Sequence, residues 1–167
     1  MKRIVIAALL SVFVAAPAVA ADGKNSVGVN YGLDLNGVIG VQGELDISSS
    51  MPNKAPVAVQ VFWKNYWQSY PTNVGTYQYS YNGFGAAAIY DFGSVAKLDK
   101  KIKPYAGLGL ITLNARLSGP NAPFSTAADS GGLYITGGVR YDLMPQVSAD
   151  LNYNNFGGLT IGAILNF

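Results

Sequence analysis

Residues 147–167 read VSADLNYNNFGGLTIGAILNF, and apolar and polar side chains alternate along most of this segment. Its first half has apolar residues at every second position, namely Val147, Ala149, Leu151 and Tyr153. After a short turn with two glycines, the alternation resumes with Leu159, Ile161, Ala163, Leu165 and Phe167. A period of two is typical of strands whose two faces meet different surroundings. The segment therefore predicts two antiparallel strands, 147–154 and 158–167.

The same alternation continues upstream and predicts six more strands. Clusters of Gly, Pro, Asn, Asp and Ser separate the runs, as they do in turns between strands. The expected strands cover about 26–35, 38–48, 56–65, 84–92, 105–116 and 133–142. Asn36-Gly37 is a dipeptide that favours a tight hairpin. A tyrosine-rich loop, residues 66–81, follows the third strand. We expect its tyrosines to extend the third and fourth strands and to stack across the pair, with a contact surface on the outside as the alternative.

Charged residues test the phase of each strand, which was set by the apolar residues. Nine charges fall within the expected strands, and all of them lie on the polar faces. They are Asp34, Glu44, Asp46, Lys64, Asp91, Arg116, Arg140, Asp142 and Asp150. In the fifth strand this phase predicts that Tyr105, Ile111 and Leu113 share the apolar face, opposite Arg116.

The N-terminal residues have the three-part anatomy of a secretory signal peptide. Lys2 and Arg3 give the positive start, residues 4–14 are apolar, and residues 18–20 are the small motif Ala-Val-Ala. An uncleaved membrane anchor is the alternative, but Pro17 and the alanine-rich end favour cleavage directly after this motif.

Cleavage divides the chain into a leader, residues 1–20, and a mature domain, residues 21–167. The leader contains two of the 11 Lys and Arg residues. The mature domain therefore has as many basic residues as acidic ones, of which there are 9. A formally neutral chain lacks the electrostatic footprint that nucleic acid requires, so no nucleic-acid partner is expected.

The composition favours strands that cross a membrane. Charged residues make up 12% of the chain, against about 25% in soluble domains. No segment of the mature domain has the roughly twenty apolar residues of a membrane-spanning helix. A sheet in lipid must close on itself to pair every backbone group. The sequence therefore predicts an all-β fold, an eight-stranded antiparallel up-and-down transmembrane β-barrel.

Aromatic residues on the apolar faces gather near strand ends, as in the interfacial girdles of membrane barrels. The girdle expected near one rim consists of Tyr90, Phe92, Tyr105, Tyr141 and Phe167.

Charges that face a narrow lumen need partners because their desolvation is costly. We expect a lumen charge network around one arginine, composed of Arg140, Asp150, Glu44, Asp46, Asp142 and Lys64. Calcium binding by Glu44 and Asp46 is the alternative for two of these carboxylates.

Three motifs resemble the small eight-stranded outer-membrane barrels, a family that includes opacity-type surface proteins and the transmembrane domain of the OmpA class. Residues 103–109, KPYAGLG, resemble the opening of a mid-barrel strand, and residues 141–146, YDLMPQ, the last periplasmic turn. The third motif is similar to the C-terminal assembly signal of these barrels and consists of Thr160, Gly162, Leu165 and Phe167.

This resemblance implies a bacterial outer-membrane location, reached through the periplasm after signal-peptide cleavage. It also implies outer-membrane lipids as surroundings, and periplasmic chaperones and the barrel-assembly machinery as partners during biogenesis. The loops are shorter than in the best-known members, which weakens any inference of adhesion from long variable loops. The oligomeric state is left open.

The absence of histidine and cysteine argues against catalysis. The outer-membrane barrels known as enzymes rely on a histidine base. Residues 83–88, GFGAAA, fit a dinucleotide-binding pattern only formally, because no helix is expected after them. No catalytic, cofactor-binding or metal-binding residue is therefore predicted. A structural, surface-exposed barrel is the expected function, with a narrow or gated porin-like channel, or recognition through the aromatic loop 66–81, as alternatives.

Overall fold

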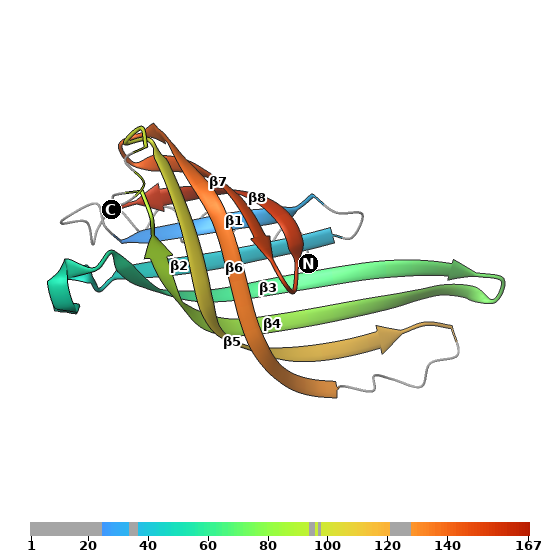
Figure 1. Cartoon of the computed structure of the whole chain (residues 1–167). Coiled ribbons are helices and arrows are strands. Elements are labelled where there is room, and N and C mark those ends of the chain that lie inside the picture. The colour runs from blue at the N-terminus through green and yellow to red at the C-terminus, as the bar shows by residue number, and fades with distance from the viewer. Residues whose placement is uncertain (1–24, 34–36, 94–95, 97, 121–127) are drawn as a thin grey trace.

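The computed structural model is a closed barrel of eight antiparallel strands (Figure 1). It describes residues 25–33, 37–93, 96, 98–120 and 128–167. The predicted leader and the residues Asn36 and Asp34 therefore lie outside the described part of the chain. The strands are β1 Ser26–Gly32, β2 Gly37–Asp46, β3 Val57–Thr72, β4 Gly75–Asp91, β5 Ile102–Ser118, β6 Ala128–Met144, β7 Val147–Asn154 and β8 Gly158–Asn166.

Each strand pairs with the next one along the chain, which confirms the predicted up-and-down order. The barrel closes between the first and last strands, where Val29 of β1 lies opposite Val41 of β2 on one side and Ala163 of β8 on the other. Closure gives every strand a partner on both sides, as a sheet in lipid requires, and only the distal extensions of strands such as β3 pair on one side. Within the described residues, no helix is long and apolar enough to cross a membrane.

The two ends of the barrel differ. The terminal end holds the start of β1, the end of β8 and the turns that follow β2, β4 and β6. Two short 3₁₀ helices, η2 Ser48–Ser50 and η3 Pro52–Lys54, lie in the first of these turns. The opposite end, called the distal end below, carries the β3–β4 hairpin, which projects beyond the other strands in Figure 1.

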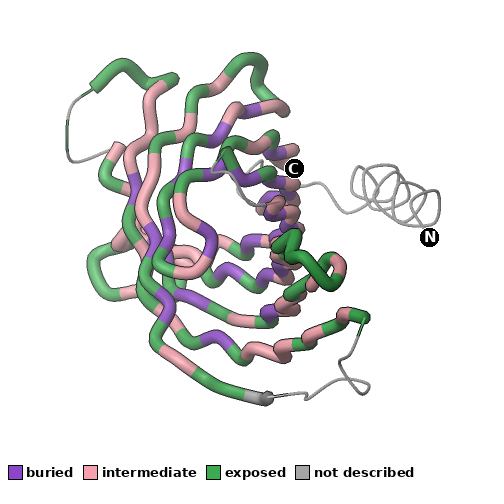
Figure 2. The backbone as a smooth tube through the Cα atoms, turned by 90° about the vertical axis from the view of Figure 1, so that its right-hand side faces the viewer, coloured by how far each residue is buried: buried purple, intermediate pink, exposed green. Residues whose placement is uncertain are grey.

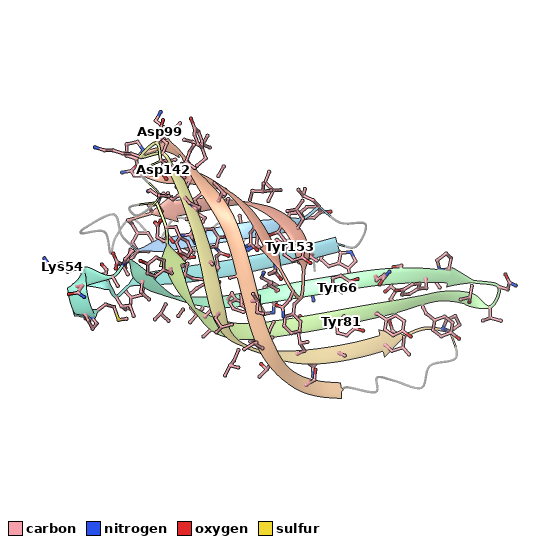
Figure 3. The ribbon with its side chains drawn as sticks, viewed as in Figure 1. Lys54, Tyr66, Tyr81, Asp99, Asp142 and Tyr153 are labelled. Carbon is pink, nitrogen blue, oxygen red and sulfur yellow. The ribbon has the colours of Figure 1, made fainter. Side chains whose placement is uncertain are left out.

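β3 and β4 continue as paired strands through residues 66–72 and 75–81, which confirms the expected extension of these two strands and leaves only a short turn between them. The rings of Tyr66 and Tyr81 pack at a tilt with centroids 5.7 Å apart, and those of Tyr70 and Tyr79 pack edge to face at 5.6 Å. Figure 3 shows the first pair side by side on neighbouring strands. Aromatic residues favour extended backbone and stabilise each other across a strand pair.

Inward and outward residues alternate along the strands, as the colours in Figure 2 show. The predicted phase is confirmed for seven strands and wrong for β5. Tyr105 and Ile111 are buried in the lumen at 4% and 2% exposure, whereas Leu110 points outwards at 70%. Leu113 follows the inward phase of Ile111, and Arg116 lies on the outward phase, against expectation. Both faces of this strand carry apolar residues, so alternation alone does not identify the outer one.

Candidate functional site

Inward side chains from β2, β6 and β7 form a charge cluster inside the barrel. Arg140 Nη2 donates a hydrogen bond to Glu44 Oε1, and Arg140 Nε lies 3.9 Å from Asp150 Oδ1. The β6–β7 register sets Arg140 directly opposite Asp150. The carboxylate side chains of Glu44 and Asp150 are 3% and 2% exposed. One guanidinium thus lies between two buried carboxylates.

Neutral side chains complete the hydrogen bonding of both carboxylates. Gln60 Nε2 donates to Glu44 Oε1 at 2.8 Å, and the Tyr105 hydroxyl donates to Asp150 Oδ1 at 2.9 Å. The Arg140 guanidinium also lies over the Tyr105 ring, 4.3 Å from its centroid. The cluster is therefore held by a cation, two acceptors and two neutral donors from five different strands of the barrel wall.

Polar side chains extend this cluster along β7 and β8. Asn152 Nδ2 donates to the Tyr105 hydroxyl at 2.8 Å and to Thr136 Oγ1. Asn152 Oδ1 accepts from Asn154 Nδ2 at 3.1 Å and from Thr160 Oγ1 at 3.4 Å. All five residues are buried. They form a continuous hydrogen-bonded layer on one side of the lumen.

Lys64 is buried closer to the distal end, at 6% exposure. Its Nζ donates to the Tyr134 hydroxyl at 2.9 Å and lies 5.1 Å and 5.6 Å from the ring centroids of Tyr134 and Phe62. Among the described residues it makes no ion pair. Contacts with two aromatic faces stabilise a desolvated ammonium group.

The other side of the lumen is apolar. Phe62, Ile89, Ile111 and Tyr134 pack together there, and the rings of Phe62 and Tyr134 lie 4.2 Å apart. Every one of the eight strands contributes at least two buried side chains. Side chains therefore fill the interior across its width, as expected for a barrel of this size.

Three residues of the predicted charge network, Asp142, Asp46 and Lys64, lie outside the cluster. Asp142 pairs with Lys103 at 2.6 Å and accepts from Ser148 Oγ at 2.7 Å. Asp46 Oδ1 accepts from the backbone N–H of Ser48 at 2.6 Å. Both carboxylates lie near the terminal end, where nearby partners satisfy them. Arg140, Glu44 and Asp150 are brought together, while Lys64 occupies a separate position closer to the distal end.

The girdle prediction is wrong for Tyr105, whose hydroxyl belongs to the lumen cluster. The other four aromatic residues follow the outward phase near the terminal end. Phe92 and Tyr141 are 41% and 44% exposed, and Tyr90 packs on Phe92 with ring centroids 4.8 Å apart. Backbone hydrogen bonds of 2.8 Å and 3.0 Å join Phe167 to Asn25, next to the barrel closure.

The four residues that resemble an assembly signal divide between the two faces of β8. Thr160 is fully buried inside the lumen, and Leu165 and Phe167 follow the outward phase. A Cβ atom at Gly162 would lie 2.5 Å from the Val29 carbonyl oxygen. Glycine is thus required there by the close approach of β1, whatever the role of the motif in assembly.

Sequence reasoning placed Tyr105 on the wrong face and missed the packing of Phe62, Ile89, Ile111 and Tyr134, called the aromatic plug below. Yet β5 contains a signal that identifies its inward face. Gly107 and Gly109 alternate in phase with Tyr105, and a Cβ at Gly107 would lie 2.3 Å from Ile89 Cδ1. Glycines in a crowded lumen make room for large inward neighbours, as Gly85 does for Phe62. In β5, the inward face is therefore identified better by the residues that alternate in phase with its glycines than by the polarity of its side chains.

The described residues contain no group of three or more acidic side chains that could hold a metal ion. Glu44, one of the two candidate calcium ligands, is bonded to Arg140 and Gln60. Residues 83–88, which fit a dinucleotide-binding pattern, lie inside β4 and are followed by more strand. The pattern lacks the helix N-terminus that would hold a phosphate.

Comparison with known proteins agrees with this architecture. The family described as "Outer membrane protein beta-barrel domain" matches residues 4–161. No curated protein matches the sequence. Among solved structures, neisserial surface protein A is 20% identical, with a TM-score of 0.59 over 86% of this chain and 94% of that one.

Two further structures share the fold. The N-terminal β-barrel domain of Pseudomonas aeruginosa OprF is 15% identical, with a TM-score of 0.54 over 86% of this chain and 96% of that one. The Yersinia pestis outer membrane protein Ail in a phospholipid bilayer nanodisc is 14% identical, with a TM-score of 0.52 over 86% of this chain and 98% of that one. At these identities the likeness concerns the fold alone.

Proposed function

Since this chain belongs to the outer-membrane β-barrel family and is therefore a protein of the bacterial outer membrane, we propose that it is a structural, surface-exposed barrel that catalyses no reaction and conducts no solute. The filled lumen carries this proposal. The Arg140 cluster blocks one side of the interior, and the aromatic plug around Tyr134 blocks the other.

The outward faces support lipid as the surroundings of the barrel. Leu110 of β5, Val61 of β3 and Leu133 of β6 are 70%, 57% and 52% exposed. A continuous apolar surface of this kind is unfavourable in water and favourable in hydrocarbon. Lipid contact gives the exposed side chains the environment that a soluble β-sandwich would provide in its core.

Single-channel recording in planar bilayers tests the closed lumen. The wild-type protein should give no conductance steps. A Tyr105→Ala/Tyr134→Ala variant, which removes one side chain from each half of the blockage, should conduct. Tyr153→Ala is the matched control, because Tyr153 is 63% exposed on the outer face, and it should remain silent. Steps in the wild type equal to those of the double variant would favour the channel alternative.

The proposed orientation has the terminal end in the periplasm and the distal end outside, because short turns are typical of the periplasmic side. The chain contains no cysteine, so single cysteines report on topology. A Val74→Cys variant at the tip of the β3–β4 hairpin should react with an impermeant maleimide on intact cells. A Gln146→Cys variant should react only after the cells are broken. The reverse pattern would invert the orientation.

Biogenesis follows the route that the sequence predicts. Residues 1–20 are removed, periplasmic chaperones carry the mature domain, and the barrel-assembly machinery inserts it. Mass spectrometry of the outer-membrane species should find Ala21 as the first residue. A mass that includes Lys2 and Arg3 would refute cleavage.

Recognition of another surface is a second candidate function, favoured by the projecting β3–β4 hairpin. Trp67, Tyr70 and Val74 are 41%, 44% and 63% exposed there. Tyrosine and tryptophan provide large contact areas at low entropic cost. Replacing residues 69–78 by a two-residue Asn-Gly turn should leave the barrel folded. It should also abolish attachment of expressing cells to a surface that binds cells with the wild-type protein. Equal attachment with and without the hairpin tip would exclude this function.

A further inference from the structure

The outward face of β3, β4 and β5 changes character towards the distal end. Residues that lie opposite each other form successive rows across these strands. In order, the rows are Val61-Ala86-Leu110, Trp63-Phe84-Thr112, Asn65-Asn82-Asn114 and Trp67-Ser80-Arg116. The apolar belt thus ends at an aromatic pair, a row of carboxamides follows, and a row with a cation comes next.

The row of asparagines is ordered by its own hydrogen bonds. Asn65 Nδ2 donates to Asn82 Oδ1 at 2.8 Å. Carboxamides both donate and accept, so they match the hydroxyl groups of sugars. Directly beneath them, Trp63 packs against Phe84 with ring centroids 6.5 Å apart. This arrangement is that of a membrane interface, with aromatic rings at the hydrocarbon edge and hydrogen-bonding groups above.

An open hollow of about 660 Å³ lies in the next row. Trp67 and Arg116 occupy its two sides, and the register places the small side chain of Ser80 between them. Ser69, Gln78 and Ser118 from the following row extend its lining. The hollow exists because small residues separate two large ones, and it is several times larger than a single phosphate group requires.

Arg116 supplies the hollow with positive charge. Its side chain is exposed, and no ion pair among the described side chains involves it. The nearest acidic position in the register is Asp129, whose backbone pairs with Asn114, one pleat away. A guanidinium group binds phosphate through paired N–H donors.

We propose that this hollow binds the phosphorylated sugar headgroup of a glycolipid in the outer leaflet. Arg116 pairs with the phosphate, the serines and Gln78 bond to sugar hydroxyls, and Trp67 packs against the apolar face of the sugar. The hollow lies on the same outward face as the lipid-facing belt, two residue rows beyond the aromatic pair Trp63 and Phe84 that ends it, so a headgroup in the hollow leaves its acyl chains directed towards that belt. The proposal rests on the proposed orientation, in which the distal end faces outside.

Trp67 emission provides a direct test. In a Trp63→Phe background Trp67 is the only tryptophan, because the chain contains two. The variant is refolded into a series of phosphatidylcholine vesicles prepared with increasing proportions of lipopolysaccharide, which is then present in both leaflets. The emission should shift saturably, and Arg116→Ala should weaken the apparent affinity about tenfold, as loss of a charged hydrogen bond does. Lys100→Ala, which removes an exposed cation at the terminal end, should change nothing.

A titration with phosphatidylglycerol, which has the negative charge but no sugar, separates glycolipid recognition from charge alone. It should give a weaker shift than lipopolysaccharide. Equal shifts for the two lipids, or equal affinities of Arg116→Ala and its parent, would overturn the proposal. Each variant is first shown to be folded by its heat-modifiable migration on gels. Because these vesicles present lipopolysaccharide on either face, the result does not depend on the orientation in cells or on conductance.

Discussion

Replacement of Arg140 by alanine should destabilise the barrel strongly, because it leaves two carboxylates buried without their shared cation. Glu44 and Asp150 are 3% and 2% exposed and lie on either side of the guanidinium. Removing one partner of a buried ion pair costs about 3–5 kcal/mol. Glu44 keeps its bond from Gln60 and Asp150 its bond from Tyr105, so the lower half of that range applies. We expect a loss of about 3–4 kcal/mol in the free energy of unfolding.

The Lys103–Asp142 pair provides a matched control within the same barrel. Its atoms are 2.6 Å apart, closer than Arg140 Nε and Asp150 Oδ1, but its side chains are 39% and 22% exposed. Exposed pairs contribute about 0–1 kcal/mol because solvent screens them. Lys103→Ala should therefore cost well under half of what Arg140→Ala costs.

Urea unfolding in lipid vesicles, followed by gel migration and tryptophan fluorescence, measures both losses. The triple variant Arg140→Met/Glu44→Gln/Asp150→Asn removes all three charges and should recover most of the stability lost in Arg140→Ala. Equal losses for Arg140→Ala and Lys103→Ala would refute the reasoning. A triple variant less stable than Arg140→Ala would show that the charges stabilise the barrel as a set.

Three further predictions concern packing, lipid contact and assembly. Gly109→Ala should lower the free energy of unfolding by about 1–3 kcal/mol, since its Cβ would lie 2.0 Å from the Ala86 carbonyl oxygen. Gly131→Ala, whose Cβ would lie 3.7 Å from its nearest neighbour, should cost far less in the same urea titration. Leu110→Arg should cost about 2–4 kcal/mol in vesicles because this side chain faces lipid, and a cost near zero would mean that it does not. Deletion of Phe167 should block assembly in cells but still permit refolding into detergent, measured by heat-modifiable migration; normal assembly in cells would remove its role as a signal.

Much of the fold could be predicted from the sequence because strand alternation is a local property. The runs around Leu151 and Ile161 contain nearly all of their apolar residues on one face, with Ile164 as the exception, so their phase and pairing were predicted correctly. The order of the strands followed from the shortness of the turns, since neighbours in sequence then become neighbours in the sheet. The extension of the β3–β4 hairpin was favoured by its tyrosines, because aromatic residues stabilise each other across a strand pair.

The candidate site was predictable only where one strand pair determined it. Arg140 and Asp150 lie on consecutive strands around a tight turn, so their register follows from local sequence. Glu44 reaches the same guanidinium from β2, a contact across 96 residues of chain that depends on the curvature and shear of the whole barrel. No spacing within the chain could have selected it over Asp46 or Asp142.

The sequence by itself determined a closed antiparallel barrel for lipid, because alternation, low charge and short turns each depend on neighbours along the chain. The tertiary structure decided what fills that barrel. Tyr105 and Ile111 point inwards because the lumen beside Ile89 and Tyr134 is apolar and Gly107 leaves room for them. A period of two distinguishes two faces of a strand but does not say which face is inside. Packing against residues far away in the sequence makes that choice.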